Sequence, residues 1–172
     1  MVKAVLFDIG GVVIVPRYNR FYRYLFVGLE ILLNPFLDSE SRIRKCVRMY
    51  IETSRLDGDV VRIIKKLRAT GYRIGVISNT SPERARANDL MDGYRGFDTV
   101  ILSHEVGIRK PDERIFKIAL ERIGLEAGGC VFIDDHTQNV RAAERIGIKG
   151  ILYKNPRQLE RDLAALGVRT GE

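Results

Sequence analysis

The stretch that decides the fold is VKAVLFDIGGVVIV, residues 2–15. An apolar run, Val5-Leu6-Phe7, ends on one carboxylate, Asp8; two glycines and a second apolar run over 12–15 follow. A short β-branched and aromatic run is typical of a strand buried on both faces, as in a parallel sheet. Because a carboxylate is costly inside a core, we expect Asp8 at the carboxyl edge of the sheet, where open α/β sheets bind ligands. On this stretch alone, a strand that ends in a turn formed by Asp8 explains the residues equally well.

The composition is typical of a soluble globular protein. The chain has 172 residues, of which 45% are hydrophobic and 30% charged, which fits one domain or one domain with a small insertion. The sequence shows no signal peptide and no apolar run of the ~18 residues that a membrane span needs. Its two cysteines have neither a disulfide pattern nor zinc-ligand spacing. We therefore expect a cytoplasmic protein with no membrane contact.

The net charge of +7 raises the question of a nucleic-acid partner. The charges are spread along the faces of the predicted helices, however, and no block of about five or six like charges occurs, as a basic tail would show. We expect a small anionic substrate and no nucleic acid.

Residues 16–56 differ from the rest because they are rich in aromatic and basic side chains. Four apolar residues at helical spacing predict a first helix over about 19–33: Phe21, Leu25, Leu29 and Leu32. Asn34-Pro35 ends it, and a second helix is predicted from 38–39 to about 54. We interpret 16–56 as a small two-helix insertion, called the cap below. Its aromatic face covers a site, pairs two subunits in a homodimer, or packs on the core as an ordinary helical hairpin.

From residue 57 onward, strands alternate with helices. The apolar runs predict strands at 73–77, 97–102, 131–133 and 150–153. Capping residues, prolines and apolar periodicity predict helices that start at 57–59, 81–82, 112, 137 and 156. This alternation predicts right-handed crossovers and a doubly wound parallel sheet with helices on both faces, hence an α/β core formed by 1–15 and 57–172.

Polar residues follow four of the predicted strands. They are Asp8, Ser78-Asn79, Lys110 and Asp134-Asp135. Taken singly, each has a plain explanation as a turn former, a helix cap or a surface lysine. In a parallel sheet, however, the carboxyl ends of all strands lie at one edge, so these groups are expected to meet.

The chemistry of this set points to phosphate. Carboxylates brought together repel unless a cation or protons intervene, and hard oxygen ligands suit Mg²⁺. Lysine, serine and asparagine supply hydrogen-bond donors for phosphate oxygens. The sequence therefore predicts a Mg²⁺ site at which Asp8 attacks phosphorus.

These motifs resemble those of the haloacid dehalogenase-like hydrolase superfamily, over nearly the whole chain. The family's Asp-x-Asp-Gly-Thr/Val motif corresponds to Phe7-Asp8-Ile9-Gly10-Gly11-Val12, and its Ser or Thr at a strand end to Ser78 in VISNTS. Its Lys in a Gly-x-x-Lys-Pro context corresponds to Lys110, and its acidic pair to Asp134 and Asp135. The resemblance implies a Rossmann-like sheet with a small helical cap inserted after the first strand.

The resemblance also implies a role for each matching residue. Asp8 would be the nucleophile, Ser78 with Asn79 would hold the transferring phosphoryl group, and Lys110 would neutralise that group and orient Asp8.

The metal ligands follow from the same resemblance. Asp8, Asp134 and Asp135 would hold Mg²⁺ together with the backbone carbonyl of Gly10.

One position departs from the family pattern. Phosphatases of the family usually have a second Asp two residues after the nucleophile, as general acid and base; this chain has Gly10 there. The leaving group is then a good one, or another group substitutes (His104, His136 or Tyr18), or hydrolysis has been lost. His136 beside the acidic pair is the better histidine, although it is also explained as a polar residue at a helix start.

Three functions compete on this evidence. The first is a Mg²⁺-dependent phosphatase that acts on a small phosphorylated metabolite through an aspartyl-phosphate. The second is a phosphate-binding or interaction protein on the same scaffold, which Gly10 favours. A haloacid dehalogenase is the third, but it would have no use for an acidic pair that holds Mg²⁺.

Overall fold

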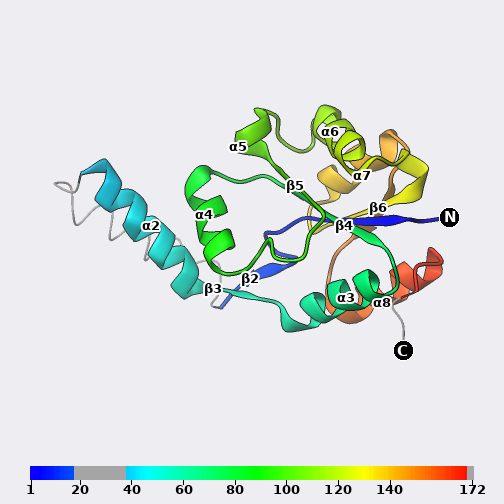
Figure 1. Cartoon of the computed structure of the whole chain (residues 1–172), viewed down its shortest axis with the longest axis horizontal. Helices are drawn as coiled ribbons and strands as arrows, with labels where there is room; N and C mark the ends of the chain where they lie inside the picture. Colours follow the sequence, from blue (N-terminus) through cyan, green and yellow to red (C-terminus); the bar gives the residue numbers. More distant parts are fainter. Residues whose placement is uncertain (18–37, 170–172) are drawn as a thin grey trace.

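A five-stranded parallel sheet forms the centre of the computed structural model, which describes residues 1–17 and 38–169 (Figure 1). Its strand order is β5-β4-β1-β6-β7, and all neighbouring strands run parallel. The strands are β1 (Ala4–Phe7), β4 (Arg73–Ser78), β5 (Thr99–Leu102), β6 (Cys130–Asp134) and β7 (Lys149–Leu152). The strand predicted from the run Val5-Leu6-Phe7 is therefore the middle strand of the sheet, and the α/β prediction is confirmed.

Alternate residues of β1 enter two separate cores, as a strand buried on both faces requires. Val5 and Phe7 belong to the core under α3 (Gly58–Ala69) and α8 (Pro156–Ala165). Leu6 belongs to the core under α6 (Glu113–Ile123) and α7 (Thr137–Arg145), where Phe116 meets Phe132 edge-to-face at 5.0 Å. Helices thus cover both faces, which makes the sheet doubly wound.

The helix starts agree with the capping signals. Asp57, rather than Asp59, caps α3 by accepting from the N–H groups of the first turn. Ser81 caps α4 (Pro82–Leu90). Asp112, predicted to be the first residue of a helix, is instead the residue that caps α6. These side chains satisfy N–H groups that the helices leave open.

Two details differ from the sequence prediction. The strand predicted from 97 begins at Thr99, because the Asp98 carboxylate itself accepts the N–H of Ile74 at 2.7 Å. The connection expected as a plain loop at 103–111 contains one helical turn, α5 (Ser103–Val106), which ends at Gly107 with φ 68°.

A second, two-stranded sheet lies between the core and the insertion. The strand β2 (Ile14–Pro16) pairs antiparallel with β3 (Ser54–Leu56). Between them, the predicted second helix of the insertion is α2 (Ser39–Thr53), capped by Asp38 and extending away from the sheet (Figure 1). The predicted first helix at 19–33 and Tyr18 lie outside the described residues, and the division into a core and a cap stays a prediction.

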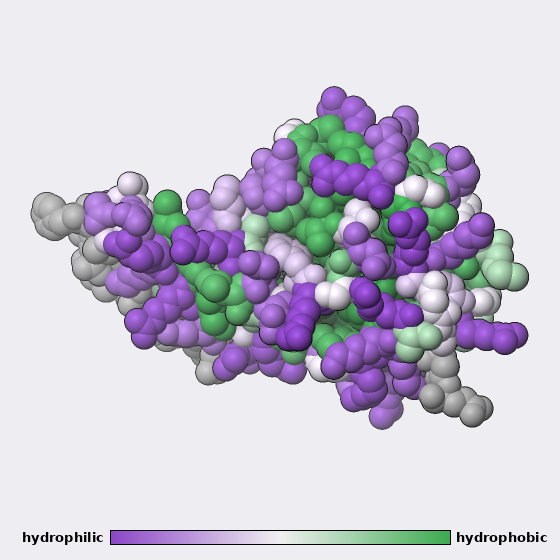
Figure 2. All heavy atoms as spheres, viewed as in Figure 1, coloured by the Kyte–Doolittle hydropathy of each residue, from purple (hydrophilic) through white to green (hydrophobic). Residues whose placement is uncertain are grey.

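The surface view agrees with the dispersed charge of the sequence. Hydrophilic side chains cover most of the visible face, and hydrophobic patches lie between them, some of them along α2 (Figure 2). Within 1–17 and 38–169, no helix is long and apolar enough to cross a membrane.

Candidate active site

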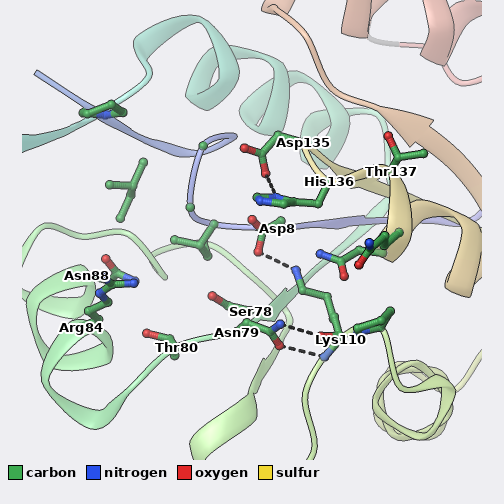
Figure 3. Close-up of a pocket in the computed structure, with 18 of the residues that line it drawn as sticks. Asp8, Ser78, Asn79, Thr80, Arg84, Asn88, Lys110, Asp135, His136 and Thr137 are labelled. Carbon is green, nitrogen blue, oxygen red and sulfur yellow. Dashed lines mark hydrogen bonds and ion pairs between the residues drawn. The ribbon is translucent and has the colours of Figure 1, made fainter. Parts of the chain in front are cut away.

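A cleft of about 750 Å³ opens at the carboxyl ends of the central strands. Six of the predicted site positions line it: Asp8, Gly10, Ser78, Asn79, Lys110 and Asp135. Figure 3 shows the side chains of Asp8, Ser78, Asn79, Lys110 and Asp135 around the cleft. Asp134 lies behind them, fully buried at the end of β6. The strands β1 and β6 are neighbours on either side of the point where the strand order reverses, which is where such sheets bind ligands.

Lys110 is the centre of the site. Its Nζ donates to Asp8 Oδ1 at 2.6 Å, to Asp134 Oδ2 at 2.7 Å and to the carbonyl of Ile77 at 2.7 Å. The side chain is 1% exposed. Three acceptors match the three protons of an ammonium group, so Lys110 is held in one place and joins the ends of β1, β4 and β6.

Asn79 fixes the backbone that carries this lysine. Its Nδ2 donates to the carbonyl of Lys110 and its Oδ1 accepts the Lys110 N–H, both at 2.8 Å. The amide therefore bridges the end of β4 to the loop after α5 in a two-point contact. Contact of Asn79 with a phosphoryl group stays a prediction, and the structure gives it a positioning role that sequence reasoning did not foresee.

Asp134 is fixed from three sides. Besides Lys110, it accepts from the Nδ2 of Asn139 at 2.9 Å and from the N–H of His136 at 2.8 Å. Asn139 was missed by the sequence reasoning, although its place in the first turn of α7, five residues after the carboxylate, was a usable signal. These bonds satisfy a carboxylate that is 0% exposed.

Asp135 turns toward the cleft beside His136, whose Nδ1 lies 2.7 Å from its Oδ1. Ligand atoms of Asp134, Asp135 and His136 all lie within 4.8 Å of one another. Gly11 approaches this cluster closely: it has a φ of 89°, and a Cβ there would lie 2.8 Å from the Cγ of Asp135. The backbone conformation therefore favours glycine at 11, and a side chain there would displace the carboxylate of Asp135.

Burial and neighbouring carboxylates raise the pKa of Asp8 to about 6. Loss of hydration is the largest cause; the ammonium of Lys110 opposes it, and the charge of Asp134 adds to it. Of the described carboxylates at this edge, Asp8 and Asp134 share the ammonium of Lys110, and Asp135 beside them adds a third carboxylate, which leaves negative charge at the mouth of the cleft. A divalent cation that prefers oxygen ligands would offset this charge, so the donor set fits Mg²⁺.

The two histidines that are candidates for the missing acid and base differ in their position relative to the cleft. His136 lines the cleft, with its Nδ1 against Asp135. His104 is on α5 and is not among the described residues that line the cleft. Gly10 itself faces open space, since no atom would lie within 4 Å of a Cβ added there.

The chain is similar to several known proteins. A family model for haloacid dehalogenase-like hydrolases matches residues 29–147. Flavin mononucleotide hydrolase 1 of Arabidopsis thaliana is 28% identical, over 81% of this chain and 57% of its own length. The glyceraldehyde 3-phosphate phosphatase of Pyrococcus abyssi is 27% identical, over 80% of this chain and 58% of its own length. The chain thus spans little more than half the length of either relative.

Solved structures show the same fold. The HAD family enzyme bt-2542 of Bacteroides thetaiotaomicron, solved with magnesium and inorganic phosphate, superposes with a TM-score of 0.72 at 21% identity. The match covers 90% of this chain and 95% of that one. Because the family model spans well over half of the sequence, the chain belongs to the haloacid dehalogenase-like hydrolase family.

Proposed function

We propose that this hydrolase is a Mg²⁺-dependent phosphatase that acts on a small phosphorylated metabolite through an aspartyl-phosphate on Asp8. The observation that carries the proposal is the ammonium of Lys110, which lies 2.6 Å from Asp8 and 2.7 Å from Asp134 at a cleft also lined by Ser78 and Asp135. The two relatives named for phosphate-ester hydrolysis and the neighbour solved with magnesium and phosphate support it.

In the first step, a carboxylate oxygen of Asp8 attacks phosphorus, and the bond from phosphorus to the ester oxygen breaks. The ester oxygen leaves with the bonding electron pair and takes up a proton. A water molecule then attacks the phosphorus of the aspartyl-phosphate, which releases inorganic phosphate and restores the carboxylate. Lys110 holds Oδ1 of Asp8 and offsets negative charge throughout, and the hydroxyl of Ser78 donates to a phosphoryl oxygen.

Asp8, Asp134, Asp135 and the carbonyl of Gly10 would hold the Mg²⁺. The ion, when bound, offsets the charge of the phosphate group as it is transferred. Asp134 is the rigid member of this set because both of its oxygens already accept hydrogen bonds from the chain.

The glycine at position 10 sets a requirement on the substrate. Without a side chain to protonate the ester oxygen, hydrolysis favours leaving groups that are stable as anions, unless His136 donates the proton. Since a Cβ at 10 meets no atom within 4 Å, Gly10→Asp has room for a carboxyl group. We expect this variant to speed hydrolysis of alkyl phosphates, by up to about 10²–10⁴-fold, and to change hydrolysis of aryl phosphates much less. An equal effect on both esters would show that the ester oxygen needs no proton donor at position 10.

The primary test is phosphate release from p-nitrophenyl phosphate, with Mg²⁺ and with a chelator. We expect turnover by the wild type that requires Mg²⁺ and is lost in Asp8→Asn. The exposed Asp89→Asn is the matched control and should retain turnover. A wild type that is inert with Mg²⁺, or an Asp8→Asn variant that is fully active, would refute the proposed mechanism.

The second candidate is a phosphate-binding protein without turnover, which the missing side chain at Gly10 favours. It predicts Mg²⁺-dependent binding of inorganic phosphate by a wild type that hydrolyses no ester. The homodimer through the cap stays a prediction whose apolar residues, 21–37, lie outside the described residues. The cytoplasmic location and the absence of a nucleic-acid partner also stay predictions.

A further inference from the structure

The far wall of the cleft carries polar groups that the phosphoryl chemistry does not use. Arg84 and Asn88 are four residues apart on α4 and therefore share one face of the helix. Both line the cleft, across from Lys110 (Figure 3), together with Tyr50 of α2 and with Ile14 and Pro16 of β2.

Arg84 is a cation available to a ligand. Its guanidinium carbon lies 6.0 Å from the ring centroid of Tyr50. Within the described part of the chain, its backbone N–H donates to the hydroxyl oxygen of Ser81, and no carboxylate pairs with its side chain. Lys110, by contrast, is fully engaged by its three acceptors. A planar guanidinium beside an aromatic ring is well suited to bind a carboxylate or phosphate through two parallel hydrogen bonds.

Asn88, in the same wall, has a side-chain hydrogen-bond acceptor without a partner. The residue is 2% exposed, and its Nδ2 donates to the hydroxyl of Tyr94 at 3.1 Å. Its Oδ1 is buried and has no hydrogen-bond partner in the described chain. Buried acceptors almost always have a partner, so a donor from outside the chain is expected at this atom. Ser54, whose hydroxyl is likewise unpartnered, is not among the residues that line the cleft.

We propose that Arg84 and Asn88 form a subsite for the part of the substrate that lies beyond the phosphate. The substrate is then a phosphate ester that carries a second anionic group, bound by Arg84, and a hydroxyl group that donates to Asn88 Oδ1. The inference rests on the proposed phosphatase function and adds the chemical class of its substrate. The cleft of about 750 Å³ is large enough for such a metabolite, and the positive net charge of the chain favours its approach.

The charge recognition is tested with pairs of esters that have matched leaving groups. 3-Phosphooxypropanoate and 4-phosphooxybutanoate are each compared with the carboxamide of the same acid. At the preferred chain length, we expect kcat/KM to favour the acid over its amide by about ten- to a hundredfold. Arg84→Gln should abolish this preference, mainly through KM, because the contact is made equally in the ground state and the transition state.

Arg86→Gln is the matched control. It removes the same charge from the same helix, but Arg86 is exposed and not among the residues that line the cleft, so the preference for the acid should remain. A wild type that does not distinguish acid from amide at either chain length would overturn the proposal. So would a loss in Arg86→Gln as large as that in Arg84→Gln, because the effect would then be one of overall charge.

The hydroxyl contact is tested on the substrate side and needs no variant. D-glycerate 3-phosphate differs from 3-phosphooxypropanoate by one hydroxyl group, and we expect the wild type to favour the hydroxylated ester. Equal kcat/KM for these two esters would refute the role of Asn88.

Failure of the subsite and failure of the phosphatase function give different results. A wild type that hydrolyses p-nitrophenyl phosphate but treats acids and amides alike refutes the subsite alone. If the wild type hydrolyses no ester, the phosphatase function fails, and calorimetry with Mg²⁺ decides on the subsite. The wild type must then bind 4-phosphonobutanoate more tightly than its amide, whereas Arg84→Gln must bind the two equally. Equal binding of acid and amide by the wild type would overturn the subsite.

Discussion

Replacing Asp8, the proposed nucleophile, should stabilise the metal-free protein. The pKa of Asp8 is about 6 in the folded chain, against an ordinary value of 3.8, chiefly because the carboxyl group is buried. A pKa shift of one unit corresponds to about 1.4 kcal/mol of free energy. Charging Asp8 therefore costs the folded state about 3 kcal/mol more than the unfolded chain. Asp8→Asn keeps the shape and removes this cost. Because the new amide N–H₂ must also be accommodated, we expect a gain of about 1–3 kcal/mol near neutral pH.

The pH dependence has a definite sign. A pKa raised in the folded state means that the protonated Asp8 contributes stability below about pH 4, and that this contribution is lost as the pH rises through about 6. The advantage of Asp8→Asn should therefore be full above about pH 7 and should vanish toward about pH 4.

The assay is urea unfolding followed by circular dichroism, in the presence of a chelator, at both ends of this pH range. Asp89→Asn on the surface of α4 is the control and should change stability by less than about 0.5 kcal/mol. Adding Mg²⁺ should stabilise the wild type more than Asp8→Asn, since the wild type retains all of the proposed carboxylate ligands. An Asp8→Asn protein no more stable than the wild type near neutral pH, or one with a larger gain in acid, would refute the reasoning.

Three further outcomes are expected. Lys110→Met leaves two buried carboxylates without their shared ammonium, so metal-free protein should lose about 3–5 kcal/mol near neutral pH and less in acid, as measured by urea unfolding; unchanged stability would contradict this. Gly11→Ala, whose Cβ would crowd the carboxylate of Asp135, a proposed Mg²⁺ ligand, should weaken Mg²⁺-dependent activity more than Gly10→Ala, whose Cβ meets open space; the reverse order in a Mg²⁺ titration would be inconsistent with the geometry. The thiol of Cys130 is buried and its pKa is raised to about 11 by burial, so a thiol reagent near pH 8 should label the half-buried Cys46 first and Cys130 only after unfolding; simultaneous labelling of both in native protein would argue against this packing.

The sequence was enough to predict that the site residues lie close together, because most of them follow the carboxyl ends of strands. Asp8 and Asp134 each follow a buried apolar run, and a parallel sheet brings such ends to one edge. That rule required only the order of strands and helices, which hydrophobic periodicity supplies.

Contacts that depend on tertiary packing could not be predicted in the same way. The two-point bond between Asn79 and the backbone of Lys110 joins residues 31 positions apart, and nothing in the local sequence specifies it. The face of α4 with Arg84 was missed because PERARANDL has few apolar residues to show which side of the helix is buried. The antiparallel pairing of β2 with β3 was not predicted either, because two strands of three residues give little periodicity.

The pairing of β2 with β3 has an evolutionary consequence. Val15 lies opposite Arg55, and the N–H of Arg17 donates to the carbonyl of Thr53 at 2.8 Å, so the two ends of the intervening segment lie side by side. A chain that leaves and returns at one point can change in length without moving the strands that carry the candidate catalytic groups. We expect insertions and deletions between 17 and 53 to be tolerated among descendants of this sequence, and new substrate preferences to arise there while the chemistry of the sheet edge stays constant.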